Sequence, residues 1–416
     1  MSMEPKIRFK GFSGIWNSLD LISTFDYIPN NTFSRKDLSI NGIVKNIHYG
    51  DILVKFDEIL NISEAQLPAI SYISSTSRPL QNGDIVMADT AEDETVGKAV
   101  EIVDIQDNLV EAGLHTYALR PNTSFARGFL GYYINSPAFH DQLLPLIQGT
   151  KVCSISKKAL SFLSLFVPSK NAEQQAIASY FQAIDAQISS SKSRLASLKQ
   201  IKVASLQSMF PQEGETVPKV RFKGFEGEWK KKCFADITYE SGIKNRENLP
   251  LESYSISNEY GFIPQSEQFE NGGSMAQADK RMYYIVSPNT FAYNPARINV
   301  GSLGYYTSDQ NSGKDVIVSS LYEVFKTTPD IDDLFLLYWF KTDAFKRLIE
   351  IYQEGGVRLY FFYDKLCQCE TLFPSLLEQQ AIASFFRSLD RKISLETARL
   401  EKLKQIKAAC LDKMFV

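Results

Sequence analysis

The side chains best suited to specific chemistry lie in a turn of the second half of the chain, Tyr293–Arg297 (YNPAR). An Asn side chain such as Asn294 can form two hydrogen bonds with adenine, and an Arg side chain such as Arg297 can form two with guanine. The pair therefore has the chemistry to read base edges in a DNA groove. The alternative is structural, since an Asn in a turn often binds its own backbone.

Other basic, amide and aromatic side chains occur in short polar segments. Lys and Arg bind phosphates, while amide and hydroxyl groups contact phosphates or bases. For the Tyr72–Arg78 loop (YISSTSR), a solvated turn is an equally good interpretation. The candidates for DNA contact in the first half are Lys45, Asn46, Tyr72, Ser74, Thr76, Arg78 and Lys151, with His48 and Tyr49 beside them. Those in the second half are Lys244, Asn245, Arg246, Lys280, Arg281 and Arg358, in addition to Asn294 and Arg297.

Motifs for catalysis are incomplete. Tyr293-Asn-Pro-Ala296 approaches the Asn/Asp-Pro-Pro-aromatic motif of adenine methyltransferases, but it lacks the second Pro and the aromatic residue. Val96-Gly-Lys98 and Ser312-Gly-Lys314 lack the upstream Gly and the following Ser or Thr of a phosphate-binding loop. We therefore predict that the chain has no catalytic residues and no cofactor of its own.

Cysteine and histidine are too sparse to indicate a metal site. The chain has five Cys and three His. Cys367-Gln-Cys369 has the spacing of half a site without a second cluster, which predicts reduced thiols and no metal. Reduced thiols, and an N-terminal segment without a signal-peptide pattern, predict a cytoplasmic location. The formal net charge of −3 argues against a uniformly basic nucleic-acid coat, so any DNA contact must come from local patches.

The segments that position these candidates form an internal repeat. Glu173–Pro211 returns as Glu378–Val416, with 22 of 39 aligned residues identical. Lys6–Trp16 (KIRFKGFSGIW) returns as Lys219–Trp229 (KVRFKGFEGEW), with eight of eleven identical. Identity at this level predicts that the chain contains two copies of one unit.

The longer repeat predicts a long helix in each copy. Apolar residues recur at steps of three, four and seven, which makes one apolar stripe on a rod of roughly 50 Å. Because an isolated stripe of this kind is unstable in water, we predict that the two helices pair antiparallel as an imperfect coiled coil. Two separate core helices are the simpler alternative. The stripe residues are Ile177, Phe181, Ile184, Ile188, Leu195 and Leu198, and Ile382, Phe386, Leu389, Ile393, Leu400 and Leu403.

Each long helix is expected to follow a globular head of mixed α/β structure. The RFKGF segments read as entry strands that dock a Phe/Trp cluster, and 129–139 and 335–345 read as matching pairs of short helices. The head interiors do not match, as expected for two binding heads with different targets. Strands are predicted at 52–56, 85–88 and 99–105 in the first head, and at 254–256, 262–264, 283–286, 299–306 and 316–325 in the second. The predicted domains are heads at 1–170 and 211–376 and helical spacers at 171–210 and 377–416.

This arrangement resembles the specificity subunit of Type I restriction–modification systems. The resemblance rests on the paired EQQAIA…LKQIK…MF helices, the RFKGF..W segments and the Pro-Ser joints at 168–169 and 374–375. It implies an α+β fold with two target-recognition domains, each reading half of a bipartite site in double-stranded DNA. It also implies that the helices bind methyltransferase subunits, with two as the expected number. A motor–nuclease subunit would join the complex, which would methylate adenine and cut DNA.

Two other functions fit the same features. One is a coiled-coil scaffold with two protein-binding heads, which the acidic balance favours slightly. The other is the specificity component of a combined cutter–methylase system, whose adaptor would have the same appearance.

Overall fold

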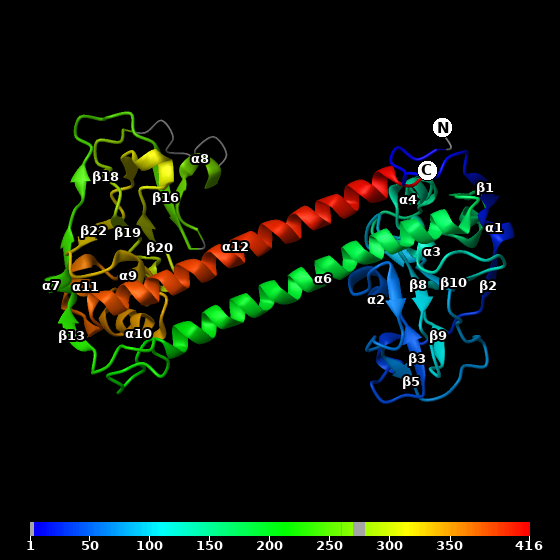
Figure 1. Cartoon of the computed structure of the whole chain (residues 1–416), viewed down its shortest axis with the longest axis horizontal. Helices are drawn as coiled ribbons and strands as arrows, with labels where there is room; N and C mark the ends of the chain where they lie inside the picture. The colour runs from blue at the N-terminus through cyan, green and yellow to red at the C-terminus, as the bar shows by residue number, and fades with distance from the viewer. Residues whose placement is uncertain (1–3, 259, 269–278) are drawn as a thin grey trace. The chain divides into compact units, whose positions relative to one another are not determined.

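The chain forms two compact units, each containing one head and part of both long helices. The computed structural model describes residues 4–258, 260–268 and 279–416 (Figure 1). Unit 1 comprises Met1–Ser193 with Ala398–Val416, and unit 2 comprises Arg194–Thr397. The long helices are α6 (Asn171–Ser208) and α12 (Leu376–Lys413). Among the described residues, no helix is both long enough and apolar enough to span a membrane.

The two long helices are antiparallel within each unit. In unit 1 the start of α6 meets the end of α12, where the rings of Phe181 and Phe415 stack with centroids 5.7 Å apart. In unit 2 the end of α6 meets the start of α12, where Phe210 and Phe386 stack at 6.1 Å. This confirms the predicted pairing. The stripe does more than join the helices, since Phe181 and Phe386 also belong to the cores of the heads.

A framework sheet, packed against a pair of short helices, is common to both units. In unit 1 its order is β2 (Phe25–Ile28), β10 (Thr116–Pro121), β6 (Ile85–Ala88), β8 (Ala99–Val103) and β4 (Ile59–Asn61), with α3 (Phe129–Ile134) and α4 (Pro137–His140). In unit 2 the order is β14 (Thr238–Glu240), β22 (Glu323–Thr327), β19 (Thr290–Tyr293) and β20 (Leu303–Tyr306), with α9 (Asp333–Trp339) and α10 (Asp343–Tyr352).

A second sheet, with its own small core, differs between the units. In unit 1 it has the order β5 (Ala69–Ile70), β3 (Val44–Ile47) and β9 (Val110–Ala112). In unit 2 it has the order β15 (Ile243–Lys244), β18 (Tyr284–Val286), β21 (Val316–Val318), β16 (Ser253–Ser257) and β17 (Gly261–Pro264). The divergence expected from the unmatched interiors is therefore concentrated in this second layer.

Short elements complete the heads. Two-stranded pairs are β1 (Asn17–Asp20) with β12 (Ser164–Val167), β7 (Thr90–Ala91) with β11 (Cys153–Ser154), and β13 (Lys230–Cys233) with β23 (Glu370–Phe373). Short helices are α1 (Leu21–Thr24), α2 (Tyr49–Val54), α5 (Lys157–Leu160), α7 (Phe234–Ile237), α8 (Gln265–Gln268) and α11 (Tyr363–Gln368). Single 3₁₀ turns occur at Arg35–Asp37, Leu144–Leu146, Ile298–Val300 and Gln310–Gly313.

The repeated RFKGF segments dock as predicted but are not strands. The Arg8 guanidinium binds the buried Glu173 carboxylate at 2.6 and 2.9 Å, and Arg221 binds Glu378 at 2.7 Å through both nitrogens. Each Arg also donates to a glycine carbonyl six residues later, at 2.6 Å, which closes a turn in place of the predicted strand. The backbone N–H of Ile7 donates to the carbonyl of Lys413 at 2.9 Å. In the same way, the backbone N–H of Val220 donates to the carbonyl of Ser208 at 2.9 Å.

The aromatic clusters confirm the predicted docking of Trp. Trp16 packs edge-on against Phe415, and Trp229 packs edge-on against Phe210. Each long helix therefore ends with a Phe inside a head core. In unit 1 this Phe comes from the end of α12, and in unit 2 it comes from the end of α6.

Three of the predicted strands are wrong in part. The segment 316–325 is divided by a turn into β21 (Val316–Val318) and the start of β22 (Glu323–Thr327). The segment 52–56 lies largely in helix α2, because the His48 imidazole caps that helix by accepting a hydrogen bond from Gly50 N–H at 3.2 Å. This cap favours a helix more strongly than the β-branched residues of the segment favour a strand. The segment 299–306 begins as a 3₁₀ turn and becomes a strand only at Leu303, after Gly301 with φ +92°.

Candidate nucleic-acid interface

The turn after the third framework strand contacts a tight loop at the same place in both units. In unit 1, Ile155 N–H donates to Asp89 C=O at 2.9 Å, and in unit 2, Phe361 N–H donates to Pro295 C=O at 3.0 Å. The loops just before these donors are residues 148–154 and 354–360, which we call the glycine loops. Each is closed by two backbone hydrogen bonds of 2.8–3.0 Å between its end residues.

Glycine is required in each loop by its geometry. Gly149 has φ +100° and Gly355 has φ +128°, in the region that residues with a Cβ rarely adopt. An added Cβ would lie 2.0 Å from the Val152 carbonyl oxygen or 2.2 Å from that of Arg358. The tight closure exposes the loop tips, so that Val152 keeps 57% of its surface and Val357 is fully exposed. Lys151 and Arg358 are exposed on the same tips.

In unit 2 this contact brings together three of the candidates, Asn294, Arg297 and Arg358. The side-chain oxygen of Asn294 accepts a hydrogen bond from Ala296 N–H at 3.0 Å, and its carbonyl accepts one from Arg297 N–H at 3.0 Å. The structural role considered for Asn294 is therefore present. It holds the turn that presents the exposed Arg297 beside the glycine loop.

A second group of candidates gathers at the edge of the second sheet in unit 2. Strand β15 pairs with β18, and Asn245 N–H donates to Tyr283 C=O at 2.9 Å, so Lys244–Arg246 lies next to Lys280–Arg281. Asn245 is buried and binds both backbone groups of Leu249, and Arg281 is chelated by Asp279 at 2.6–3.0 Å. Among the described residues of this group, Arg246 is the exposed cation without an ion pair of this kind.

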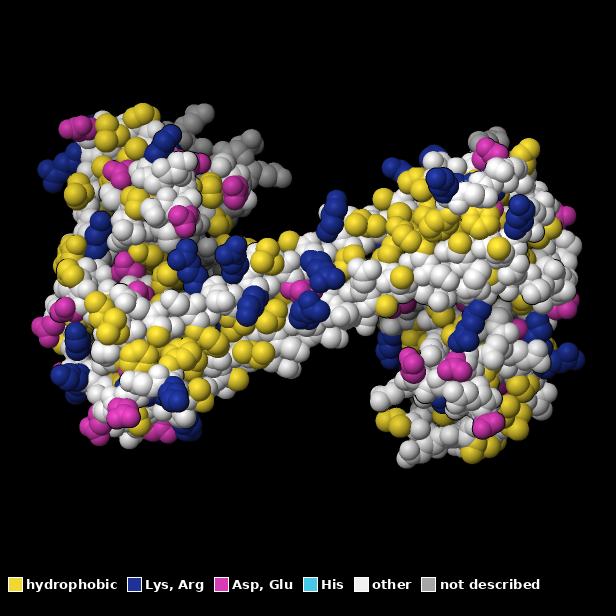
Figure 2. Space-filling view, in the orientation of Figure 1, with side chains coloured by type: hydrophobic (Ala, Val, Ile, Leu, Met, Phe, Trp, Pro, Cys, Tyr) yellow, Lys and Arg dark blue, Asp and Glu magenta, His cyan; other side chains and the backbone are white. Residues whose placement is uncertain are grey.

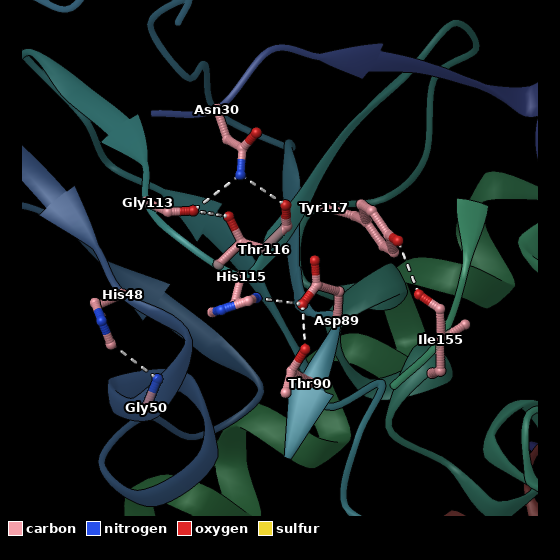
Figure 3. A network of polar contacts seen from close by, with 10 residues as sticks. All are labelled: Asn30, His48, Gly50, Asp89, Thr90, Gly113, His115, Thr116, Tyr117 and Ile155. Atoms are coloured by element: carbon pink, nitrogen blue, oxygen red, sulfur yellow. Dashed lines mark hydrogen bonds and ion pairs between the residues drawn. The ribbon is translucent and has the colours of Figure 1, made fainter. Parts of the chain in front are cut away.

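In unit 1 the corresponding turn carries a polar network that the sequence did not reveal. Figure 3 shows His115, Asp89 and Thr90 facing one another, and Asp89 is bonded through its carbonyl to Ile155, the residue that follows the glycine loop. His115 Nδ1 lies 3.3 Å from Asp89 Oδ1, and Thr90 donates to the same oxygen at 2.7 Å. Asn30 supports the segment by donating to the Gly113 and Thr116 carbonyls at 3.0 Å each. These residues are far apart in sequence and follow no motif, so no pattern pointed to them.

The His48–Tyr49 candidate lies at the edge of the same network. The Tyr49 ring centroid is 4.6 Å from that of His48 and 5.2 Å from that of His115. Burial lowers the pKa of His48, and the Arg35 guanidinium lowers it further. His48 thus stays neutral and can cap α2 through Nδ1, while His115 is half exposed and can face a ligand.

The remaining candidates of unit 1 differ in exposure. Asn46 is fully buried and donates to Asn31 at 3.0 Å, and Lys45 Nζ donates to the Ile62 carbonyl at 2.8 Å, so both support the fold. Tyr72 is exposed and its ring packs edge-on against Phe33. The Ser74 and Thr76 hydroxyls bind each other at 2.9 Å, and Arg78 is exposed, with its backbone tied to Pro29 beside Asn30.

Comparison with known proteins connects this arrangement to one family. Residues 228–405 match the family model described as the Type I restriction modification DNA specificity domain. No curated protein sequence matches the chain. The chain is similar in structure to a Type I restriction–modification S subunit from M. genitalium, with a TM-score of 0.60 and 14% identity over 100% of this chain and 99% of that one.

Two further solved structures agree. The HsdS subunit from Thermoanaerobacter tengcongensis aligns with a TM-score of 0.50 and 14% identity over 100% of this chain and 99% of that one. A chain from a study of complex assembly and conformational transition in the type I R–M system aligns at 0.52 and 13% over 96% of this chain and 97% of that one. Residues 228–405 therefore match the Type I restriction modification DNA specificity domain, and the whole chain has the fold of the Type I specificity subunits.

Proposed function

We propose that each head of this specificity subunit reads one half of a bipartite DNA site. The observation that carries the proposal is a repeated framework that presents two different polar surfaces beside equivalent glycine loops. In unit 2 the surface beside the loop has Asn294 and Arg297, and Arg246 belongs to the second group at the edge of the second sheet; these side chains suit base edges. In unit 1 it has His115, Arg78 and the Tyr72–Arg78 loop. The chain supplies recognition, and partner subunits supply methylation and cleavage.

The glycine loops have a different role in this proposal. They occur at equivalent places in both units, so they contact what both half-sites share, the phosphate backbone. Lys151 and Arg358 are single cations on otherwise uncharged loop tips, which suits one phosphate each. Such contacts position the protein on DNA without reading sequence.

The long helices set the separation of the half-sites and bind the methyltransferase subunits, one for each unit. The repeated contacts at the helix ends support this part of the proposal, because they hold equivalent stretches of both long helices in each unit. A motor–nuclease subunit would join through that complex.

Exchange of one head tests the reading role. Residues 20–165 are replaced by the equivalent head of another specificity subunit, and methylated adenines are mapped by single-molecule sequencing. The half-site read by unit 1 should change while the other half-site and the spacer stay the same. An unchanged methylation pattern, with the complex still active, would refute the proposal.

Insertion into the helices tests the spacing role. Four residues, about one helical turn, are added to both α6 and α12. The complex should then select a longer spacer between unchanged half-sites. Selection of the original spacer by an intact complex would contradict the role of the helices as a measure of distance.

A further inference from the structure

One pair of facing positions in the framework sheets is polar in unit 1 and apolar in unit 2. The register of β6 and β10 places Asp89 opposite His115, and the Asp89 N–H donates to the His115 carbonyl at 3.1 Å. The equivalent positions of unit 2, by the register of β19 and β22, are Pro295 and Leu321, each 206 residues further along the chain. The framework therefore forms without a polar pair at this place, so its packing does not explain the carboxylate and the imidazole.

The backbone of His115 is held in an unfavourable conformation by its neighbours. Its φ is +56°, in the left-handed region that few residues other than glycine adopt. The Asn30 side chain donates to the carbonyls of Gly113 and Thr116, on either side of it, at 3.0 Å each, and the Thr116 hydroxyl donates to the Gly113 carbonyl at 2.6 Å. Such a conformation persists only where surrounding contacts enforce it, and it is common in residues that bind ligands.

The imidazole ring of His115 is fixed on two sides and open on another. Its Nδ1 lies 3.3 Å from Asp89 Oδ1, which also accepts a hydrogen bond from the Thr90 hydroxyl at 2.7 Å (Figure 3). The Tyr49 ring meets the imidazole edge-on, with centroids 5.2 Å apart. The Asp89 carbonyl in turn accepts from Ile155 N–H, which ties the pair to the glycine loop. The His115 side chain nevertheless keeps 47% of its surface exposed.

The contact with Asp89 decides which ring nitrogen carries the proton. A carboxylate oxygen only accepts hydrogen bonds, so Nδ1 of the neutral ring is the protonated nitrogen. Nε2 then has a free lone pair and is an acceptor. It lies on the far side of the ring from the carboxylate, and no residue in the described parts of the chain is hydrogen-bonded to it. The fold thus presents one acceptor, at a fixed place close to the glycine loop of unit 1.

A neutral imidazole acceptor selects one kind of DNA group. Phosphate oxygens are themselves acceptors, so Nε2 in this state cannot bind the DNA backbone as Lys151 does in the proposed function. In the major groove the base-edge donors are the exocyclic amines, N4 of cytosine and N6 of adenine, and in the minor groove the donor is N2 of guanine. Arg297 of unit 2 has the opposite polarity, because a guanidinium only donates. The two heads therefore suit different base edges.

We propose that His115 is a specificity-determining residue of unit 1, whose Nε2 accepts a hydrogen bond from the exocyclic amine of one base in the half-site. Asp89 is the positioning residue, since it orients the ring and fixes its proton. The inference rests on the proposed function, which supplies DNA as the ligand. It adds the atom that makes the contact and the class of base group that this atom reads.

Removal of single exocyclic amines from the DNA tests the contact. Binding by the full complex is measured at about pH 8, where an imidazole is neutral. Each adenine, cytosine or guanine of the unit 1 half-site is replaced, one at a time, by purine, 2-pyrimidinone or hypoxanthine. Removal of the amine that His115 reads should weaken binding by the parent about fivefold, the value of one hydrogen bond. The variant His115→Gly should lose nothing further at that position and should keep the parent's losses elsewhere.

The coupling between the side chain and the base is a ratio of affinities, which separates reading from folding. Glycine adopts the left-handed backbone of this position readily, and a loss of folded protein would weaken binding to both DNAs alike. Equal losses for the parent and the variant at every amine would overturn the inference. Coupling to guanine O6 or N7, or to a phosphate, would also overturn it, because Nε2 would then be a donor. If exchange of residues 20–165 still changed only one half-site, the proposed function would stand.

Variants of Asp89 test its positioning role. Asp89→Asn keeps an oxygen that can accept from Thr90 and from Nδ1 of His115, so the coupling should stay within about twofold of the parent's. Asp89→Ala removes that oxygen, frees the proton to occupy either ring nitrogen, and should reduce the coupling by more than half. The matched control is Glu92→Ala, which removes an exposed carboxylate of the same segment and should leave the coupling unchanged. Full coupling in Asp89→Ala would contradict the role of Asp89.

Discussion

The two heads of this chain differ in what the repeat has preserved. The framework sheet, the short helix pair and the contacts with the long helices recur in both units, although the sheet of unit 1 has an additional edge strand, β4. The second sheet has three strands in unit 1 and five in unit 2, with no common order. The preserved part is the part that packs against the long helices. The comparison shows that a shared support restrains one layer of each head and leaves the other layer free to diverge.

The same difference extends to polar groups inside the framework. Glu101 of unit 1 is buried, and it accepts hydrogen bonds from Gly128 N–H at 2.6 Å and Gly131 N–H at 2.9 Å. Burial raises the pKa of this carboxyl, while the two N–H groups oppose the rise. In unit 2, Tyr305 takes this place and reaches Asp333 at the start of α9. The start of the first short helix is thus held by a strand residue in both heads, with different chemistry.

The largest expected effect comes from removing the terminal Phe of each long helix. Phe210→Ala should destabilise unit 2, and Phe415→Ala should destabilise unit 1, each by about 3–5 kcal/mol, because both rings fill a head core. Hydrogen exchange, followed separately for the amides of each unit, measures this change in stability. If either variant lowers the stability of both units equally, the two units do not have separate cores as described here.

The second effect concerns the repeated ion pairs. Arg8→Met leaves the buried Glu173 carboxylate without its partner, and Arg221→Met does the same to Glu378. Each change should cost about 3 kcal/mol in its own unit, measured by chemical denaturation. The matched controls are Lys10→Ala and Lys223→Ala, two exposed positions of the same repeat, which should stay within about 0.5 kcal/mol of the parent.

The third effect separates reading from positioning in unit 2. Arg297→Ala should weaken binding of the complex to its specific site by about 1–3 kcal/mol and relax only the half-site read by unit 2. Lys230→Ala, an exposed control on the same head, should leave affinity unchanged. Fluorescence anisotropy with single-base variants of the site measures both. Loss of preference in both half-sites would break the assignment of one half-site to each head.

A smaller effect is expected at the glycine loops. Lys151→Ala and Arg358→Ala should each lower the slope of log affinity against log salt by about one and weaken all sequences alike. Equal changes would show that the loops are equivalent. If one variant instead changed the preference for particular bases, its loop would belong to the surface that reads the DNA sequence.

The smallest effect is a pH dependence confined to unit 1. Because burial lowers the folded-state pKa of His48, the neutral form is favoured in the fold. The stability that neutral His48 contributes to the fold is complete above the pKa of the unfolded state, about 6.5. It is lost as the pH falls toward the lower pKa of the folded state. The unfolding temperature of unit 1 should therefore fall as the pH drops below about 6.5. The variant His48→Asn should show a weaker dependence of this temperature on pH. Parallel behaviour of unit 2, which has no His, would contradict this.

Much of the framework could be predicted from the sequence. The long helices, their antiparallel pairing, the short helix pairs and strands such as Ile85–Ala88 follow from periodicity and repetition. The RFKGF segments were wrongly predicted as strands, because apolar and basic residues alternate in them. In the structure each Arg closes a turn and binds a distant Glu. Helix α2 was missed because its cap is a His, which is not among the usual capping residues.

The candidate site could be predicted only in part. Asn294, Arg297 and Arg358 were identified individually, but their proximity depends on one backbone hydrogen bond between distant segments. Asp89 and His115 were missed for the same reason. Asn46 and Asn245 have suitable chemistry but are buried, and a single sequence does not distinguish an amide that faces DNA from one that holds a loop.

The assembly of unit 1 from Met1–Ser193 and Ala398–Val416 has a consequence for biosynthesis. A ribosome delivers every residue of unit 2 before it delivers Met414 and Phe415, which belong to the core of unit 1. The head translated first is thus the last to complete its core. During translation the core of unit 1 therefore stays incomplete until Met414 and Phe415 have been made.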